Sequence, residues 1–474
     1  MIVSWDKIPP FGAGLTEVRT GIWQLSEVKM RRKKGILWIL LSAMLLGGLA
    51  GCRRPGGGSE MTDAVSVKES PEESGDGEDK EFSGITLTML NFSSATPAGV
   101  LAKTCAAAEE KFGFRIEIEP CYDDNVVRTR LATGECPDLL IYNTGSLLYS
   151  LNPSEFFLDL TDTGMAETLD KDFIRAASVD GVLYGIPQCD GMGAGVFYNK
   201  ELYQEYGLGV PETWEEFKGN LEVLQNAGVD AMGIALNELV SSQLPFLADN
   251  YQVMYDNPDF AREFTAGKTG FADSEEGRRT WERYEELVPY FNKDCAAVSI
   301  PELENRFFGN ELGHLIYFSS KIPEWILTYG DKINKIGFFA MPGDTGEETG
   351  LTIWPSTGIY GNKKSEHTEA VTAFLEWYIS EEGLDVLTSF YTPAGIFHTG
   401  YRPKEESIEL IQEVQRYYTE GKVIPALEYL TPVKGINCAF ICNKLGSGRI
   451  GAGEAAEAYD EECRKAALQM GLWE

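Results

Sequence analysis

The chain has 474 residues and carries 73 acidic side chains against 41 basic ones, which gives a formal net charge of −32 at pH 7. A charge of this sign repels the phosphates of nucleic acids and anionic lipid headgroups, so we exclude both as partners of the folded protein. Residues 82–474 have a globular composition, and a chain of about 400 residues usually divides into two lobes or domains.

The N-terminal part of the chain has the order of an export signal. Residues 31–34 are basic, and residues 35–51 are uncharged and mostly apolar. The apolar stretch is shorter than the ~20 residues of a membrane-spanning helix, so we interpret it as a cleavable signal peptide. Its end, Leu49-Ala50-Gly51-Cys52, resembles the lipobox of bacterial lipoproteins. That resemblance implies cleavage before Cys52 and acylation of its thiol; the alternative is a buried helix that ends at an ordinary cysteine.

The segments on either side of this signal have different interpretations. Residues 1–29 lack export character and Met30 directly precedes the basic run, so we expect translation to start at Met30 and residues 30–51 to form the signal peptide. Residues 52–81 are rich in Gly, Ser, Pro, Glu and Asp, a composition that stays disordered. We therefore predict a lipid-anchored tether and an extracytoplasmic protein at the outer face of the cell membrane.

Short strand-like runs alternate with amphipathic helices after the tether. Strands are predicted at residues 85–90, 114–119 and 138–142, and helices at 97–112 and 125–133. This βαβαβ order indicates a parallel sheet with helices on its faces, in which ligands bind beyond the carboxyl ends of the strands. The residues that follow the first and third strands are therefore expected to face a cleft: Asn91, Phe92, Tyr142 and Asn143.

The middle of the chain, residues 213–329, is predicted to be mostly helical. One helix begins at Thr213, because Glu216 stands three residues later and the pair can form a capping box. Further helices are expected near residues 274–290, 301–308 and 368–379, and the chain from Glu405 to its end is predicted to be helical as well.

Three sequence blocks carry a family resemblance: residues 180–187 (DGVLYGIP), 196–202 (VFYNKEL) and 207–217 (GLGVPETWEEF). In this order and spacing they resemble the extracellular solute-binding proteins of bacterial ABC importers, the family 1 sugar-binding type. Weaker blocks extend the resemblance from Ile85 to Gly383. It implies an α/β, two-lobed periplasmic-binding-protein-like (type II) fold with an interlobe cleft and a hinge.

The resemblance also implies where the lobes begin and end. Lobe 1 is expected to contain residues 82–191 and 357–392, and lobe 2 residues 192–356 and 393–474. The chain would cross between lobes just after Pro187, where Gly191, Gly193 and Gly195 could serve as a hinge.

Candidate ligand-binding residues are polar or aromatic and lie near these crossings. Gln188 and Asp190 could hydrogen-bond sugar hydroxyls, and the alternative is that they are solvated loop residues. Trp354, in a Gly/Pro/Thr context, is expected to pack on the apolar C–H face of a sugar ring. Trp325 is a second candidate, although Lys321 occupies the usual tryptophan position of the family. Tyr391 lies where the third crossing would fall.

The function that these features predict is binding without catalysis. The chain has no nucleophile elbow, phosphate-binding loop or His-Glu-x-x-His helix, and its three histidines are scattered, so we expect no catalytic residue, metal or cofactor. Eight cysteines follow Cys52, and we interpret them as buried free thiols, although disulfides stay open.

We expect the substrate-binding subunit of an ABC importer, with a carbohydrate ligand, permease subunits as partners and Cys52 as the membrane anchor. The alternatives are a binding protein for a peptide or polyamine, a sensor for a membrane kinase, and a surface glycoside hydrolase. Adjacent permease genes would favour transport over sensing, and turnover of an oligosaccharide would indicate the hydrolase.

Overall fold

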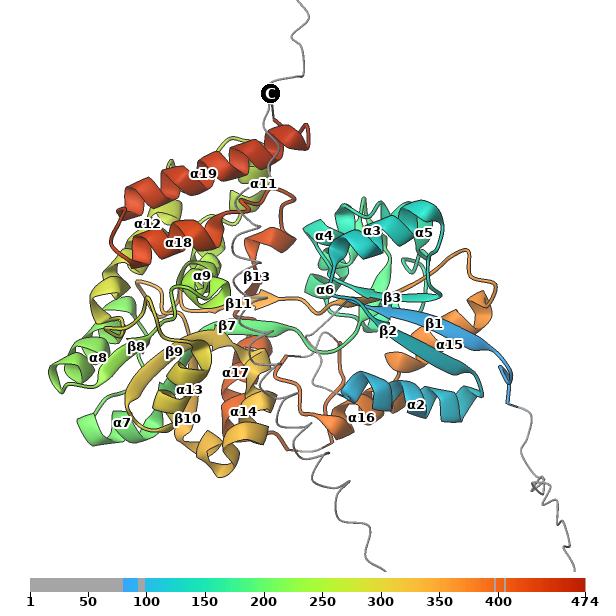
Figure 1. Ribbon diagram of the computed structural model, residues 1–474, viewed down its shortest axis with the longest axis horizontal. Helices are drawn as coiled ribbons and strands as arrows, with labels where there is room; N and C mark the ends of the chain where they lie inside the picture. The colour runs from blue at the N-terminus through green and yellow to red at the C-terminus, as the bar shows by residue number, and fades with distance from the viewer. Residues whose placement is uncertain (1–79, 93–98, 396–397, 405, 474) are drawn as a thin grey trace, which may run out of the picture. The chain divides into compact units, whose positions relative to one another are not determined.

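The structure of the protein is a computed structural model that describes residues 80–92, 99–395, 398–404 and 406–473. Cys52 and the predicted start site, signal peptide and tether up to residue 79 lie outside the described residues. The described chain forms two mixed α/β lobes, each built on its own sheet (Figure 1).

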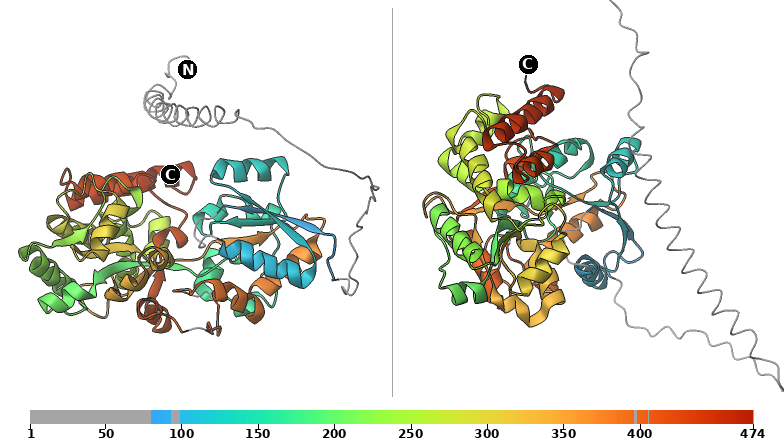
Figure 2. Two further views of the ribbon diagram at one scale, coloured as in Figure 1. Left: turned by 60° about the horizontal axis from the view of Figure 1, so that its bottom comes forward. Right: turned by 60° about the vertical axis from the view of Figure 1, so that its left-hand side comes forward.

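Lobe 1 contains a five-stranded sheet in the order β2-β1-β3-β12-β6. β1 pairs in parallel with both β2 and β3, as the βαβαβ pattern predicts, and β12 pairs in the antiparallel direction with β3 and with the edge strand β6. Helices α2 and α3 lie on opposite faces of this sheet (Figures 1 and 2). The strands are β1 Thr86–Asn91, β2 Arg115–Pro120, β3 Leu139–Tyr142, β6 Gly185–Pro187 and β12 Gly358–Gly361.

The helices of lobe 1 are α2 Val100–Phe112, α3 Asp124–Thr133, α4 Ser146–Tyr149, α5 Pro153–Phe156, α6 Lys171–Ala176, α15 Thr368–Tyr378 and α16 Glu381–Phe390, and a small hairpin consists of β4 Ser178–Val179 and β5 Val182–Leu183. α2 begins after Gly99 and ends at Gly113, whose φ of 87° is the left-handed conformation that favours glycine. Buried apolar side chains of α2 and α15 pack over the same sheet face.

Lobe 2 contains a six-stranded sheet in which β7 is central: β11 and β10 pair with successive parts of one edge of β7, and β9 pairs with the other. β13 and β8 complete the two sides. The strands are β7 Met192–Asn199, β8 Asp230–Gly233, β9 Leu312–Phe318, β10 Ile336–Ala340, β11 Leu351–Trp354 and β13 Val423–Pro425.

The helices of lobe 2 are α7 Lys200–Tyr206, α8 Trp214–Asn226, α9 Leu239–Ala248, α10 Asn250–Asp256, α11 Phe260–Thr265, α12 Glu275–Leu287, α13 Ile300–Phe308, α14 Ile322–Tyr329, α17 Glu409–Thr419, α18 Cys438–Gly446 and α19 Ala452–Gln469. α18 and α19 lie on one side of the sheet and α17 on the other (Figures 1 and 2). The capping box predicted for α8 is present, because Thr213 accepts from the Glu216 N–H and Glu216 accepts from the Thr213 N–H.

The direction of the strands determines where their loops gather. In lobe 1, β12 begins opposite Tyr142, the last residue of β3, so the ends of β1, β2 and β3 lie at the edge where the chain enters from lobe 2. In lobe 2, β7 begins opposite Trp354, the last residue of β11, and near Phe318, the last residue of β9. β8 and β13 run parallel to β9 and β11. The carboxyl ends of both sheets therefore lie where the chain crosses between the lobes. The first crossing joins β6 to β7, and the second joins β11 to β12.

The crossings differ from the sequence expectation in two respects. Gly193 and Gly195 lie inside β7, and a Cβ on Gly195 would stand 2.5 Å from the Phe338 ring, so close packing explains these glycines better than hinge flexibility. The backbone N–H of Thr399 donates to the Thr168 carbonyl, and the Tyr401 hydroxyl donates to the carboxylate of Asp385. This stretch therefore packs with lobe 1, although the sequence boundary at 392 assigned it to lobe 2.

Candidate functional site

The strand ends of the two lobes form the candidate ligand site. Lobe 1 contributes Asn91 at the end of β1, Phe92 after it and Asn143 after β3, all of them partly exposed. Lobe 2 contributes the edge of Trp354 and the segment that follows β13. Because loops at strand ends are not constrained by the sheets, they can vary to suit a ligand, while the sheets hold their positions.

Trp354 lies at the end of β11, opposite Met192. Only 5% of the residue is exposed, since its ring packs edge-to-face on Phe318 at a centroid distance of 4.9 Å and its indole N–H donates to Glu428 at 2.7 Å. The expected open ring face for a sugar is therefore not presented in this structure. Only a small part of the side chain is therefore open to a ligand at the strand ends.

Asp190 and Tyr391 join two of the crossings instead of facing a ligand. The Tyr391 hydroxyl donates to one carboxylate oxygen of Asp190, and the backbone N–H groups of Ala394 and Gly395 donate to the other at 2.8 and 3.1 Å. Burial raises the pKa of the Asp190 carboxyl to about 6, although these hydrogen bonds oppose the shift. Since the polar groups of both residues are engaged with each other, the structure corrects two expectations: that Asp190 binds sugar hydroxyls and that Tyr391 lines the cleft.

Gln188 and Tyr142 are fully buried, which corrects the expectation that they contact ligand. The side-chain oxygen of Gln188 accepts from the Thr357 hydroxyl at 2.6 Å, so the residue connects the first crossing to the second. The Tyr142 hydroxyl donates to Asp124 at the start of α3, and its ring packs 5.1 Å from that of Phe92. Both residues support the strand ends from beneath.

The prediction that Trp325 lines the site is wrong. The side chain is fully buried in lobe 2, with its ring 4.9 Å from Phe197 and 5.5 Å from Phe308. Lys321, in the turn before α14, carries an ammonium that lies 3.2 Å from Glu304 and 2.7 Å from Glu324. This turn therefore presents an ion-pair cluster.

Two parts of the site were missed from the sequence. Tyr122 follows β2 and is 86% exposed, so it is the most accessible aromatic side chain at the strand ends of lobe 1. The rule that selected the residues after the first and third strands gives Pro120 and Cys121 after the second, one residue short of Tyr122. Residues 426–437 follow β13, a strand that was not predicted because three residues give no periodicity.

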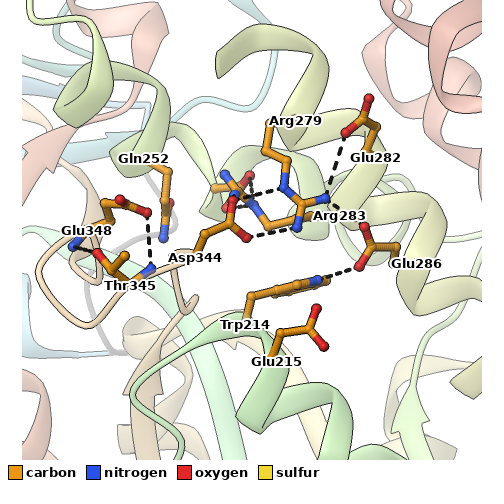
Figure 3. Close-up of polar contacts among 12 residues, drawn as sticks. Trp214, Glu215, Gln252, Arg279, Glu282, Arg283, Glu286, Asp344, Thr345 and Glu348 are labelled. Carbon is orange, nitrogen blue, oxygen red and sulfur yellow. Dashed lines mark hydrogen bonds and ion pairs between the residues drawn. The ribbon is translucent and has the colours of Figure 1, made fainter. Parts of the chain in front are cut away.

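The densest group of charged residues lies elsewhere in lobe 2, between α12 and the loop that joins β10 to β11. Arg279 contacts Asp344 at 2.8 Å and Glu286 at 2.6 Å (Figure 3). Arg283 contacts Asp344 at 3.0 Å and Asp249 at 3.0 Å. These carboxylates are committed to guanidinium groups, so they do not form the free acid and base pair of a glycosidase.

The described part of the chain also bears on metal sites, membrane spans and disulfides. No group of three or more His, Cys, Asp or Glu side chains there is arranged to hold a metal ion. None of the described helices is both long enough and apolar enough to cross a bilayer. The eight cysteines between residues 105 and 463 are not joined in disulfides, and six of them are buried.

A sequence model of the family described as "bacterial extracellular solute-binding protein" matches residues 122–384, more than half of the chain. The chain belongs to this family. The solute-binding protein is 30% identical over 93 residues to a "Multiple sugar-binding protein" of Streptococcus mutans, a match that covers 19% of this chain and 22% of the relative.

Over a longer stretch of 315 residues, the solute-binding protein is 21% identical to an uncharacterized ABC transporter extracellular-binding protein of Pyrococcus horikoshii. It covers 64% of this chain and 70% of the relative. Among solved structures, a chitin oligosaccharide binding protein superposes with a TM-score of 0.68 at 19% identity, and covers 81% of this chain and 99% of its own. This likeness confirms the two-lobed, type II periplasmic-binding-protein-like fold.

Proposed function

We propose that the protein is the substrate-binding subunit of an ABC importer and binds a carbohydrate between its lobes. The observation that carries the proposal is that the carboxyl ends of both sheets lie at the crossings, with Tyr122, Phe92 and the rim of Trp354 among the residues there. Aromatic rings stabilise pyranose C–H faces by roughly 25 cal/mol per Å² buried. The name of the Streptococcus mutans relative supports a sugar as the solute.

Binding would be coupled to lobe closure. A ligand that contacts both sets of strand ends favours the closed arrangement by its difference in affinity for the closed and open forms. The site needs no catalytic group for this role, and the ligand would be released unchanged to membrane permease subunits.

The experiment is a thermal-shift and calorimetric screen of residues 53–474 against a carbohydrate panel. A ligand at a hundredfold excess over its Kd stabilises the protein by ~2.7 kcal/mol. The site variant is Tyr122→Ala, which removes an exposed ring, and the matched control is Tyr255→Ala, an exposed ring of α10. We expect only Tyr122→Ala to weaken binding. Turnover of the saccharide would indicate a hydrolase, and binding of a peptide or polyamine alone would contradict the carbohydrate assignment.

We also propose that Cys52 is acylated and anchors the protein outside the cell. The basic run at residues 31–34, the apolar stretch and the small residues before Cys52 support this proposal. Two or more acyl chains would make the anchoring stable, since each buried methylene contributes ~0.8 kcal/mol. Cys52→Ser should release the protein from the membrane fraction, and intact mass of the precursor tests the start at Met30. Retention of Cys52→Ser in the membrane would contradict the anchor.

A further inference from the structure

One short turn of lobe 2 touches both Trp354 and lobe 1. This turn, Leu427–Tyr429, follows β13 directly. Its middle residue, Glu428, accepts the indole N–H of Trp354 on one carboxylate oxygen at 2.7 Å, while the other oxygen is paired with Lys434. Lys434 therefore holds the carboxylate in place, and the carboxylate in turn fixes the orientation of the indole.

The next residue of the turn reaches lobe 1. The ring of Tyr429 lies against Gly145, where a Cβ would stand 2.6 Å from the ring, and Gly145 has a φ of +68° that other residues rarely adopt. The hydroxyl of Tyr429 is hydrogen-bonded to Thr144, and Thr144 donates to the carbonyl of Ser356 at 3.1 Å. A lobe 2 side chain thus occupies a notch at the end of β3 in lobe 1, beside the second crossing.

We propose that Tyr429 is a latch between the lobes and that Glu428 is a positioning residue for Trp354. The turn then couples the orientation of the Trp354 ring to the angle between the lobes. Any rotation that separates or closes the lobes changes the position of Gly145 relative to Tyr429. Because Tyr429 and Glu428 are adjacent in one short turn, the carboxylate that holds the indole moves with the latch. The role in ligand capture rests on the proposed function, whereas the coupling itself does not.

The first test needs no ligand. The protein, residues 53–474, is labelled with 5-fluorotryptophan, and the 19F resonance of Trp354 is assigned from Trp354→Phe. Tyr429→Ala is expected to shift the Trp354 resonance and leave that of the buried Trp281 in place. The matched control, Tyr255→Ala, should shift neither. An unchanged Trp354 resonance in Tyr429→Ala would overturn the proposal.

Two further measurements separate coupling from a merely structural role. Glu428→Ala should shift the Trp354 resonance, and Glu428→Gln, which keeps an oxygen acceptor for the indole, should restore it. Small-angle scattering should report a broader distribution of lobe separations for Tyr429→Ala than for Tyr429→Phe, which keeps the ring in the Gly145 notch. An equal distribution for Tyr429→Ala and the unmodified protein would overturn the latch.

The last test uses whichever saccharide the panel identifies. Tyr429→Ala should change its Kd about tenfold or more, and the change should shrink in a Trp354→Phe background, since the two residues act through Glu428. Equal changes in both backgrounds would contradict the coupling. If no saccharide binds the unmodified protein, the carbohydrate function fails, while the 19F and scattering measurements still decide the latch.

Discussion

The indole N–H of Trp354 and the carboxylate of Glu428 are joined by a 2.7 Å hydrogen bond at the end of β11. This bond, with the contact between Trp354 and Phe318, places the tryptophan in the packed part of lobe 2 as well as beside the crossings. The side chain therefore has two roles that mutations can separate.

Trp354→Ala is expected to lower the free energy of unfolding by about 3–5 kcal/mol, because it empties the space of a nearly buried aromatic side chain. Trp354→Phe should cost less, since it removes the hydrogen bond to Glu428 and keeps most of the packing. Denaturant unfolding measures both values. The control is Tyr122→Ala at the exposed ring of lobe 1, for which a change within about 0.5 kcal/mol is expected. An unchanged stability in Trp354→Ala would mean that the ring is free in solution.

Arg283→Met is expected to destabilise the protein by about 3–5 kcal/mol, because it leaves the buried carboxylate of Asp249 without its cation. The double variant Arg283→Met, Asp249→Leu should recover part of this loss, since it removes both charges. Arg262→Met changes an exposed ion pair with Asp259 and should have little effect. Urea unfolding of the four proteins gives the comparison, and a double variant no better than the single one would argue against the buried pair.

Gly195→Ala is expected to cost about 1–3 kcal/mol, because the added methyl would meet the Phe338 ring at 2.5 Å and the Phe339 carbonyl at 2.7 Å. Gly209→Ala is the matched control, since nothing lies within 4 Å of its Cβ position. Thermal unfolding distinguishes the two. If both variants behave like the unmodified protein, close packing does not explain the glycine of β7.

The contribution of His314 to stability should fall as the pH is lowered from about 6.5 to 4, whereas the raised pKa of the Asp190 carboxyl acts in the opposite direction below about 6. His314 is fully buried, with Nδ1 2.8 Å from the Ala231 carbonyl and Nε2 2.7 Å from the Tyr203 hydroxyl, and burial lowers its pKa to about 4. Between these pH values the unfolded chain binds the proton that the folded one rejects, so the free energy of unfolding decreases with acid, by up to roughly 3 kcal/mol.

Burial lowers the pKa of His398 to about 4 in the same way. His314→Gln and His398→Gln should therefore each flatten the dependence of the unfolding free energy on pH in this window. Chemical unfolding at a series of pH values provides the measurement. A slope that is the same in His314→Gln as in the unmodified protein would place the origin of the acid sensitivity elsewhere.

The sequence predicts the frame of lobe 1 well, because its signals are local. Alternation over residues 85–90 and helical periodicity before Phe112 predict β1 and α2 to within a few residues, and the Thr213 capping box identifies the start of α8. The glycines of the crossing strand β7 predict a hinge from sequence alone, which is not what the structure shows. They are required by side chains of β10 and β11, and these strands lie far from β7 in the sequence, so local patterns do not reveal the contact.

The candidate site could be predicted only in outline. The rule that ligands gather at strand ends predicts a site near Asn91 and Asn143, and the structure places both residues at the strand ends of lobe 1, so that ligand binding there stays a prediction. It could not show that the Asp190 carboxylate is used by Tyr391, or that Trp325 is surrounded by Phe197 and Phe308, because these contacts join segments that the chain brings together only on folding.

The shared orientation of the two sheets has a consequence for how this protein can diversify. All the loops that follow the carboxyl ends of the strands leave the two sheets on the same side, and a residue beneath them, Tyr142, is hydrogen-bonded within the frame. Exchanges in those loops are therefore expected to change the proposed binding surface while both cores stay intact.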